Sequence, residues 1–423
     1  MARARLSLLD LPGPSSLPFT LAQLLCDAEP HADGLTSSIL RAPLPAALPA
    51  AAAAGGLARW LALKRVARED EAAPHDVVRE AQLLEHSHGA ANVVPLLGAF
   101  VDTSDPWCSW IYLVEPLYPL TLADALRIPP QGLPADWQGS MGRDFGPAAL
   151  CADCHTARFR HGVAAGLLAG LAHLHALGIA HRDIKPSNIL LSANGEPRLA
   201  DLGTACRSSA RSHTMDVGTR AYRAPELLFA PSSGYDGLAA DVWSAGTVLA
   251  EFWTPMRQTT PRVQTAAAPP PWEQALASEE AWARLERQPQ RQSESVDWQV
   301  DDDEDDDADD DEMVVSDTGY VRTTLFDERG DIALAGSIFE LLGRPSDDSA
   351  WPEAVDFCPT LQRMPFPARP PAQGGLRARL GLDTSVDAFD ERILAFCEAA
   401  LALSASARPT SALARALLVD AEE

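Results

Sequence analysis

The sequence HRDIKPSNILLSANGEPRLADLG, residues 181–203, indicates what kind of protein this chain is. Its polar run HRDIKPSN ends at Asn188, and the segment ADLG places Asp201 thirteen residues further on. Asp183 and Lys185 add a possible general base and a cation to the two oxygen ligands Asn188 and Asp201. An ordinary polar loop seldom combines these residue types at this spacing, so the segment indicates a site of phosphate chemistry.

These four side chains match what the transfer of a phosphoryl group requires. The reaction asks for an oriented nucleophile and neutralised phosphate charge, with little covalent chemistry from the protein. We expect Asp183 to accept the proton of a substrate hydroxyl and Lys185 to reach the transferring phosphate. Oxygen ligands on separate loops suit Mg²⁺, so Asn188 and Asp201 are the predicted metal ligands. The predicted cofactors are ATP and Mg²⁺, and the predicted catalytic residues are Asp183, Lys185 and Asn188.

These motifs resemble those of the eukaryotic protein kinases. The segment GTRAYRAPE at 218–226 looks like the end of an activation segment, and DVWSAGTVLAEF at 241–252 looks like the buried helix that follows it. The resemblance covers most of 57–423 apart from two insertions, and it implies that Arg408 pairs with Glu226. Because small-molecule kinases of related shape lack the APE segment, the resemblance implies a protein substrate.

Within this family, three segments look like the cyclin-dependent-kinase (CMGC) branch: 79–84, 222–228 and 325–353. The helix expected at 74–88 resembles the one that contacts a cyclin in that branch. The resemblance therefore implies a serine/threonine kinase of cell-cycle control, with a cyclin-dependent kinase as one candidate substrate. Cyclin binding is left open.

The resemblance also assigns the nucleotide site. Lys64 in LALK resembles the strand lysine that holds the α- and β-phosphates, and Glu80 resembles the helix glutamate that pairs with it. In IYLVEPLYPL, Val114 takes the gatekeeper position, and the backbones of Glu115 and Leu117 are implied to bind the adenine edge. The cofactor-binding set is therefore Lys64, Glu80, Glu115, Leu117, Asn188 and Asp201.

The lysine content bears on whether the site is active. Lys64 and Lys185 are the only lysines in the chain, among 34 basic residues. A compact ammonium and a planar guanidinium differ most in tight phosphate sites, so keeping lysine at these two positions favours an active enzyme. The alternative is a catalytically weak pseudokinase that acts as a scaffold.

The feature that supports a pseudokinase is the absence of the glycine-rich phosphate loop. The family places Gly-x-Gly-x-x-Gly upstream of the strand lysine, where this chain reads SSILRAPLPAALPAAAAAGG at 37–56. Backbone N–H groups then lack their usual close approach to the phosphates. Some fungal kinases that activate cyclin-dependent kinases also lack this loop and work without a cyclin. The resemblance therefore extends to them.

The activation segment departs from the pattern as well, because it reads DLG instead of DFG. Thr214 falls where cyclin-dependent kinases carry their activating phosphothreonine. Arg79 and Arg182 match two of the three arginines that hold this phosphate, and the third position reads Cys206. Phosphorylation of Thr214 and an unmodified exposed threonine are both open.

Strand patterns come early and helix patterns late, which predicts an α+β fold of two lobes. One kinase domain is expected over 1–423: an N-lobe at 1–116 with an irregular N-terminal segment and a five-stranded antiparallel sheet around one helix, and a mostly helical C-lobe at 117–423. The predicted strands are 60–66, 92–102 and 109–116, and the predicted helices are 74–88, 161–178, 239–253, 331–342, 389–402 and 410–421.

Two stretches read as insertions. Residues 128–156 are rich in Pro and Gly, and their CADCH motif lacks a second Cys/His pair for a metal site. Residues 254–324 carry 6 arginines against 18 acidic residues, including the run DDDEDDDADDDE at 301–312. Like charges repel one another and stay solvated, so we expect this second insertion to be disordered.

Composition limits the partners and the compartment. A net charge of −25 disfavours binding to nucleic acid or to an anionic membrane. Seven dispersed cysteines point to a reducing compartment, and the N-terminus is a poor signal peptide. We expect a monomer in the cytoplasm or nucleus, without nucleic-acid or membrane partners.

Overall fold

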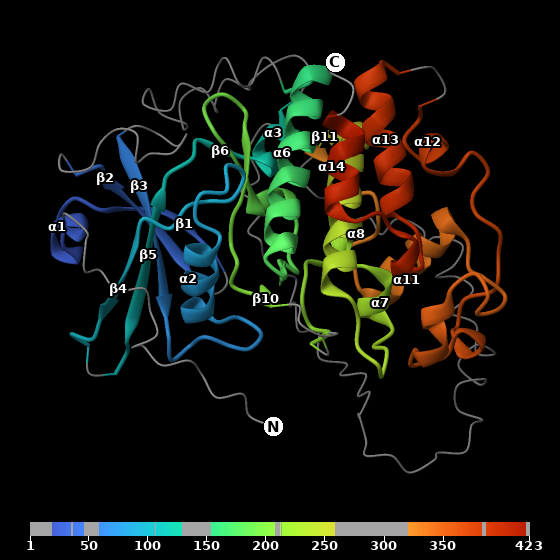
Figure 1. The fold of residues 1–423 in the computed structure, drawn as a ribbon, viewed down its shortest axis with the longest axis horizontal. Coiled ribbons are helices and arrows are strands. Elements are labelled where there is room, and N and C mark those ends of the chain that lie inside the picture. Colours follow the sequence, from blue (N-terminus) through green and yellow to red (C-terminus); the bar gives the residue numbers. More distant parts are fainter. Residues whose placement is uncertain are drawn as a thin grey trace, which may run out of the picture.

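The structure is a computed structural model that describes residues 19–34, 37–45, 59–105, 107–128, 154–207, 212, 214–258, 320–382 and 386–419. Figure 1 shows a β-rich part formed by the early residues, in blue, beside a larger helical part coloured from green to red. This arrangement confirms the two-lobed fold predicted from the sequence.

The N-lobe is one five-stranded sheet with the order β1-β2-β3-β5-β4, in which every neighbouring pair is antiparallel. Helix α2 (Val77–His86) begins at Asp76, whose side chain accepts from the Arg79 N–H. The strands are β1 (Glu29–Asp33), β2 (Ser38–Pro43), β3 (Trp60–Ala67), β4 (Gly98–Asp102) and β5 (Trp110–Pro116).

The strand predicted at 92–102 is wrong over its first half, because β4 begins only at Gly98. Pro95 has no N–H with which to extend a ladder. The preceding residues turn instead toward the C-lobe, where the Val94 N–H donates to the Leu199 carbonyl at 2.9 Å. This segment therefore connects the two lobes.

The first 57 residues contain structure that the sequence analysis missed. Helix α1 (Leu21–Cys26) starts at a capping box between Thr20 and Gln23. Its buried Leu24 joins a cluster of sheet side chains that includes Tyr112 and Val114. Helix α1 therefore covers part of the sheet.

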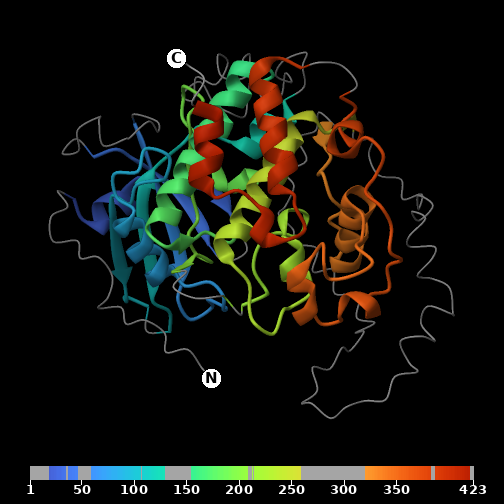
Figure 2. The same cartoon turned by 45° about the vertical axis from the view of Figure 1, so that its right-hand side comes forward.

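The C-lobe is built around the long helix α6 (Ala157–Ala176), which lies against helices that follow much later in the chain. Figure 2 shows α6, in green, beside the red C-terminal helices α13 and α14. The helices that follow α6 are α7 (Pro225–Leu228), α8 (Gly237–Ala250), α11 (Asp331–Leu342), α12 (Gly375–Arg379), α13 (Ala388–Ala400) and α14 (Ser411–Val419), and the short α3 (Leu122–Arg127) precedes it.

Short strands frame the segment that carries the predicted catalytic residues. The pairs and triplets are β6 (Leu120–Thr121) with β8 (Ile189–Leu191) and β9 (Pro197–Leu199), β7 (Ile179–Ala180) with β10 (Cys206–Arg207), and β11 (Met256–Gln258) with β12 (Tyr320–Arg322). Of these strands, β7 and β8 flank the polar loop of residues 181–188.

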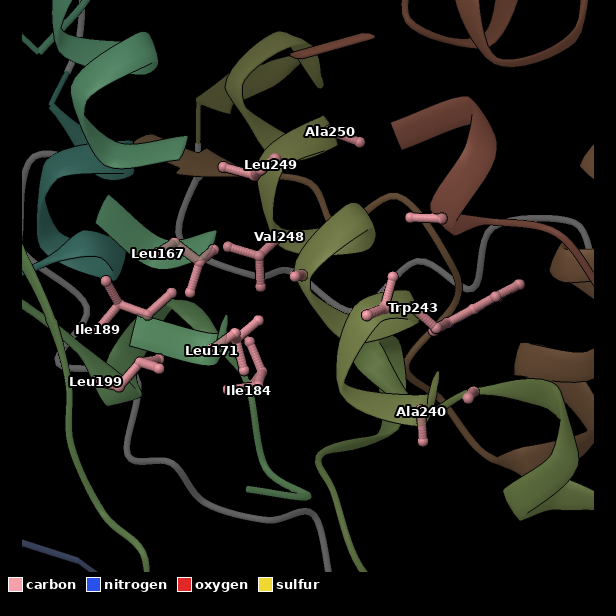
Figure 3. Close-up of a cluster of buried hydrophobic side chains, with 14 of the residues drawn as sticks. Leu167, Leu171, Ile184, Ile189, Leu199, Ala240, Trp243, Val248, Leu249 and Ala250 are labelled. Carbon is pink, nitrogen blue, oxygen red and sulfur yellow. The ribbon is translucent and has the colours of Figure 1, made fainter. Parts of the chain in front are cut away.

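Apolar residues inside this loop anchor it to the core. Ile184 and Ile189 are fully buried and lie in the cluster formed by α6 and α8, with Leu171 and Val248 among its members (Figure 3). The polar side chains between and around these two isoleucines are thereby fixed relative to the helices. Burying each isoleucine stabilises this position by roughly 1.5–3 kcal/mol.

The second predicted insertion is narrower than 254–324. Its two ends pair as the β11–β12 ribbon, with Gln258 opposite Tyr320. Arg322 donates to the Leu126 carbonyl at 3.0 Å and to the Thr254 carbonyl at 2.7 Å, so this end belongs to the folded part. The acidic run at 301–312 lies outside the described residues.

The first predicted insertion, 128–156, also lies largely outside the described residues. Cys154 is buried, and the Thr156 side chain caps α6 by accepting from the Phe159 N–H at 3.1 Å. Among the described residues, no three His, Cys, Asp or Glu side chains gather to hold a metal ion. None of the described helices is long and apolar enough to cross a membrane.

Candidate active site

A triad of charges joins the two lobes, in which Lys64 and Glu80 are largely buried and Asp201 is partly exposed. Lys64 on β3 donates to both carboxylate oxygens of Glu80 on α2, at 2.8 and 3.0 Å, and to Oδ1 of Asp201 at 2.7 Å. Asp201 belongs to the C-lobe segment ADLG and lies 137 residues further along the chain than Lys64. The structure thus brings together three of the residues predicted for nucleotide binding.

The shared ammonium affects the two carboxyl groups differently. Burial by itself would raise the pKa of Asp201, but the charge and hydrogen bond of Lys64 outweigh burial and hold that pKa well below its usual range. Burial raises the pKa of Glu80 to about 7, against the opposing effect of Lys64. When both carboxyls are ionised, the triad has one negative charge in excess, which favours binding of a cation.

The predicted base, Asp183, is held from two sides. Its Oδ1 accepts from the N–H and the hydroxyl of Thr219, at 3.0 and 2.9 Å. Its Oδ2 accepts from Asn188 Nδ2 at 3.0 Å and lies 3.6 Å from the Lys185 ammonium. Thr219 is therefore a site residue to which the sequence analysis gave no role.

The free oxygens of Asn188 and Asp201 fit a magnesium ion. Asn188 Nδ2 also donates to the Asp183 carbonyl at 2.9 Å, so Asn188 turns its amide oxygen away from these acceptors. Asp201 uses Oδ1 for Lys64, and no hydrogen bond to its Oδ2 is found among the described residues. Hard oxygen atoms on two loops are the ligands that Mg²⁺ prefers.

The backbone around the site is held in an uncommon conformation. Arg182 and Asp201 have φ angles of 70° and 63°, which non-glycine residues rarely adopt. The buried carboxylate of Asp241 on α8 accepts from the His181 and Arg182 N–H groups, both at 2.7 Å. His181 Nε2 also lies 3.0 Å from the Ala200 carbonyl, which connects the segment HRDIKPSN to the segment ADLG.

Apolar side chains cluster beside Leu117, one of the residues predicted to bind the adenine edge. Ala62 and Leu117 form a small buried cluster with Ile39, while Leu190 packs in a neighbouring cluster on the C-lobe side. The sequence analysis missed Ile39 and Leu190, which come from β2 and β8. Glu115 pairs with Ala62 in the β3–β5 ladder, and burial raises the pKa of the Glu115 side chain to about 8.

The predicted adenine contact through Leu117 stays a prediction. Its N–H donates to the Trp60 carbonyl at 3.4 Å, which is a long hydrogen bond. A ligand acceptor could replace so weak a partner.

The turn that stands in place of the glycine-rich loop lies earlier than the segment 37–56. It joins β1 to β2, where the Gly34 N–H donates to the Ser37 carbonyl at 2.8 Å. Residues 44–59 separate β2 from β3, which explains the shift along the chain. Gly34 is the one glycine between the start of β1 and the end of β2, so a glycine-rich sequence is indeed missing.

Arg182 lies near Thr214, because its Nη1 and the Thr214 N–H both donate to Ser212 Oγ. Arg79 Nη2 donates to the Pro74 and Gly203 carbonyls, at 2.7 and 3.2 Å. Arg182 donates to the Thr204 carbonyl and, at 3.2 Å, to Ser212 Oγ. Backbone carbonyls thus take up much of the hydrogen-bonding capacity that the resemblance assigned to a phosphate on Thr214.

Two further contacts, one of them predicted, concern the end of the activation segment. Arg408 and Glu226 form the predicted pair, with two hydrogen bonds of 2.7 Å and both side chains at least 95% buried. Arg223 Nε donates to the Gly218 carbonyl at 2.8 Å. Gly218 has a φ of 77°, and a Cβ there would lie 3.1 Å from the Arg182 carbonyl, so glycine suits this position.

Comparison with known proteins identifies the class. Residues 56–266 match the family described as the protein kinase domain. The chain is 48% identical over 88 residues to "Cyclin-dependent kinase D-1" of Arabidopsis thaliana, 49% over 87 residues to "Cyclin-dependent kinase 7" of Xenopus laevis, and 32% over 199 residues to "CTD kinase subunit alpha" of Schizosaccharomyces pombe. The matches cover 20%, 20% and 46% of this chain.

The chain therefore contains a protein kinase domain. Within that class it is related to the serine/threonine kinases of the cyclin-dependent-kinase-like branch. The matched segments span 22%, 24% and 28% of these three relatives, so the relatives share only part of their length with this chain.

Proposed function

We propose that this protein is an active protein serine/threonine kinase that uses ATP and Mg²⁺. The observation that carries the proposal is the orientation of Asp183 by Thr219 and Asn188, beside a complete Lys64–Glu80–Asp201 triad. A pseudokinase scaffold needs none of these contacts. Its support, the missing glycine-rich sequence, concerns phosphate binding and leaves the base in place.

Each side chain has a defined task in this mechanism. Asp183 orients the acceptor hydroxyl and takes its proton, while the Lys185 ammonium neutralises charge on the transferring group. Lys64 binds the phosphates of the nucleotide, and Glu80 holds the ammonium in place. Asn188 and Asp201 would hold the metal ion, which neutralises phosphate charge when it is bound.

We further propose that the kinase prefers proline directly after the acceptor residue. Gly218 stands where a β-branched residue is common in proline-directed relatives, and the sequence alone therefore predicts tolerance of other residues after the acceptor. The contacts favour the opposite, since the Gly218 carbonyl already accepts from Arg223. An unpaired N–H in the next substrate residue would find this acceptor occupied, whereas proline has no N–H to satisfy.

Phosphorylation of the activation loop of a cyclin-dependent kinase, without a cyclin, is an alternative proposal, which strict preference for the Ser-Pro peptide would defeat. It is supported by the cyclin-dependent-kinase-like segments and by the missing glycine-rich sequence. The printed name of one relative, a CTD kinase subunit, suggests another kind of protein substrate. A monomer in the cytoplasm or nucleus is likewise proposed.

The test uses the purified full chain, labelled ATP and Mg²⁺. Substrates are a generic basic protein, a cyclin-dependent kinase, and two peptides that differ only as Ser-Pro and Ser-Ala. We expect the wild type to transfer phosphate to the basic protein and the Asp183→Asn variant to lose this transfer. The ATP affinity of the variant should stay within a few-fold of the wild type. Equal transfer by wild type and variant would refute the role of Asp183, and equal use of both peptides would refute the proline preference.

A further inference from the structure

Three buried polar side chains from three helices form a continuous chain of hydrogen bonds beneath the catalytic loop. His175 on α6 has Nε2 at 3.0 Å from Asp241 Oδ2, and its Nδ1 lies 2.9 Å from Ser411 Oγ. Asp241 is on α8, and Ser411 is the first residue of α14. Ser411 and Asp241 are only 3% and 1% exposed.

The chemistry of the acceptor fixes the hydrogen positions. A carboxylate oxygen only accepts, so His175 Nε2 carries the proton that faces Asp241. In the neutral ring with that tautomer, Nδ1 is an acceptor, and the Ser411 hydroxyl donates to it. Ser411 thereby favours the tautomer that Asp241 needs.

Asp241 links this chain of hydrogen bonds to the backbone of the catalytic loop. Its Oδ2 accepts from the His181 N–H as well as from His175, and its Oδ1 accepts from the Arg182 N–H. Arg182 has the strained φ of 70° and directly precedes Asp183. Because strained backbone persists only where neighbours hold it, rotation of the Asp241 carboxylate would displace Asp183.

A Ser-His-Asp chain of this kind also resembles the triad of hydrolases. Burial excludes that role, since a substrate carbonyl cannot reach a serine that is 3% exposed. The chain of bonds ends on the backbone of the catalytic loop, which points to a positioning role.

We propose that Ser411 is a positioning residue for Asp183, acting through His175 and Asp241. The C-terminal helix α14 thus helps to set the geometry of the catalytic loop, 228 positions earlier in the sequence. This inference rests on the proposed kinase activity, and it adds a residue to which the sequence analysis assigned no role.

The test compares Ser411→Ala with the matched control Thr410→Ala. Thr410 Oγ1 accepts from the Leu413 N–H at 3.3 Å at the start of the same helix, so its loss weakens α14 but leaves the His175 contact intact. We expect Ser411→Ala to lower kcat about tenfold with ATP KM within twofold, since small displacements of a catalytic group are costly. Assayed well below its melting temperature, Thr410→Ala should keep kcat within twofold of the wild type.

Two measurements do not depend on kinase activity. Ring ¹⁵N shifts, assigned with a His175→Gln variant, should show the Nε2–H tautomer in the wild type and a shifted Nδ1 in Ser411→Ala. Amide hydrogen exchange at His181 and Arg182 should be faster in Ser411→Ala than in Thr410→Ala. A wild type without transfer activity would refute the proposed function alone, and these two readouts would still decide the coupling.

Two results would overturn the inference. One is that the amide hydrogen exchange at His181 and Arg182 and the ring ¹⁵N shifts of His175 are the same in Ser411→Ala as in the wild type. The other is an equal loss of kcat in Ser411→Ala and Thr410→Ala, which would show a general effect of loosening α14.

Discussion

Replacing Arg408 by methionine tests how the activation segment is anchored. The guanidinium makes two hydrogen bonds of 2.7 Å with Glu226 and also donates to the Ala402 and Ala239 carbonyls, at 2.9 and 3.0 Å. The Arg408 side chain has no exposed surface, and that of Glu226 is 5% exposed. Removing one partner of so deeply buried a pair leaves a charge without compensation, at a cost of about 3–5 kcal/mol.

An exposed ion pair supplies the control. Arg377 meets Glu391 at the same 2.7 Å, but the two side chains are 32% and 53% exposed. Pairs of that kind contribute about 0–1 kcal/mol, so Arg377→Met should change stability little. The two ion pairs match in residue type and distance, and they differ in burial and in the other partners of each arginine, which are backbone carbonyls for Arg408 and Glu398 for Arg377.

The assay is urea denaturation of both variants and the wild type, followed by tryptophan fluorescence and by far-UV circular dichroism. We expect Arg408→Met to lower the free energy of unfolding by about 3–5 kcal/mol at an unchanged slope, and Arg377→Met by less than about 1 kcal/mol. A double variant, Arg408→Met with Glu226→Gln, should recover part of the loss. Equal small losses in both single variants would refute the account.

Three other predictions follow from the site and the core. Lys64→Arg should reduce transfer strongly although charge is kept, because the larger planar guanidinium is misplaced at a site built for a compact ammonium; normal rates in a labelled-ATP assay would contradict this. Replacing 259–319 by Asn-Gly, between Gln258 and Tyr320 of the ribbon, should preserve basal activity and lower the melting temperature by less than about 10 °C. Burial raises the pKa of Glu251 to about 8, so the folded state holds its proton more tightly than the unfolded state, and stability falls as pH rises from its ordinary pKa toward 8. Relative to wild type, Glu251→Gln should gain in urea midpoint between pH 5.5 and 8.5, and an equal response of both proteins would exclude the effect.

The residues of the candidate site could be predicted where they lie close together in one sequence motif. Asp183 and Asp201 lie within one short stretch of sequence, and the structure places Asp201 against Lys64 of the N-lobe and Asp183 against Thr219 of the C-lobe. Helix α11 matches the prediction of 331–342 at both ends. Gly343, with a φ of 76°, ends this helix in the manner expected of glycine.

Most of the elements and residues that the sequence analysis missed have no local sequence pattern. Every residue of β1 is exposed, so the strand lacks the alternation by which strands are recognised. Ile39 packs beside Leu117 from a strand much earlier in the chain, so no local pattern marks it. Asp241 offered a usable signal, because a carboxylate inside the apolar helix DVWSAGTVLAEF requires buried partners.

The energetics of the charged triad argue that it serves chemistry rather than stability. Lys64 and Glu80 are 12% and 2% exposed in their side chains, so folding must remove both charges from water. Apolar residues of similar size often stabilise such a position equally well or better. The triad instead presents Asp201 with an oxygen directed away from Lys64, close to a base held in place by Thr219. A chain that otherwise uses arginine for its basic residues keeps lysine at the centre of this arrangement and again beside Asp183, the two positions where phosphoryl transfer requires a compact cation.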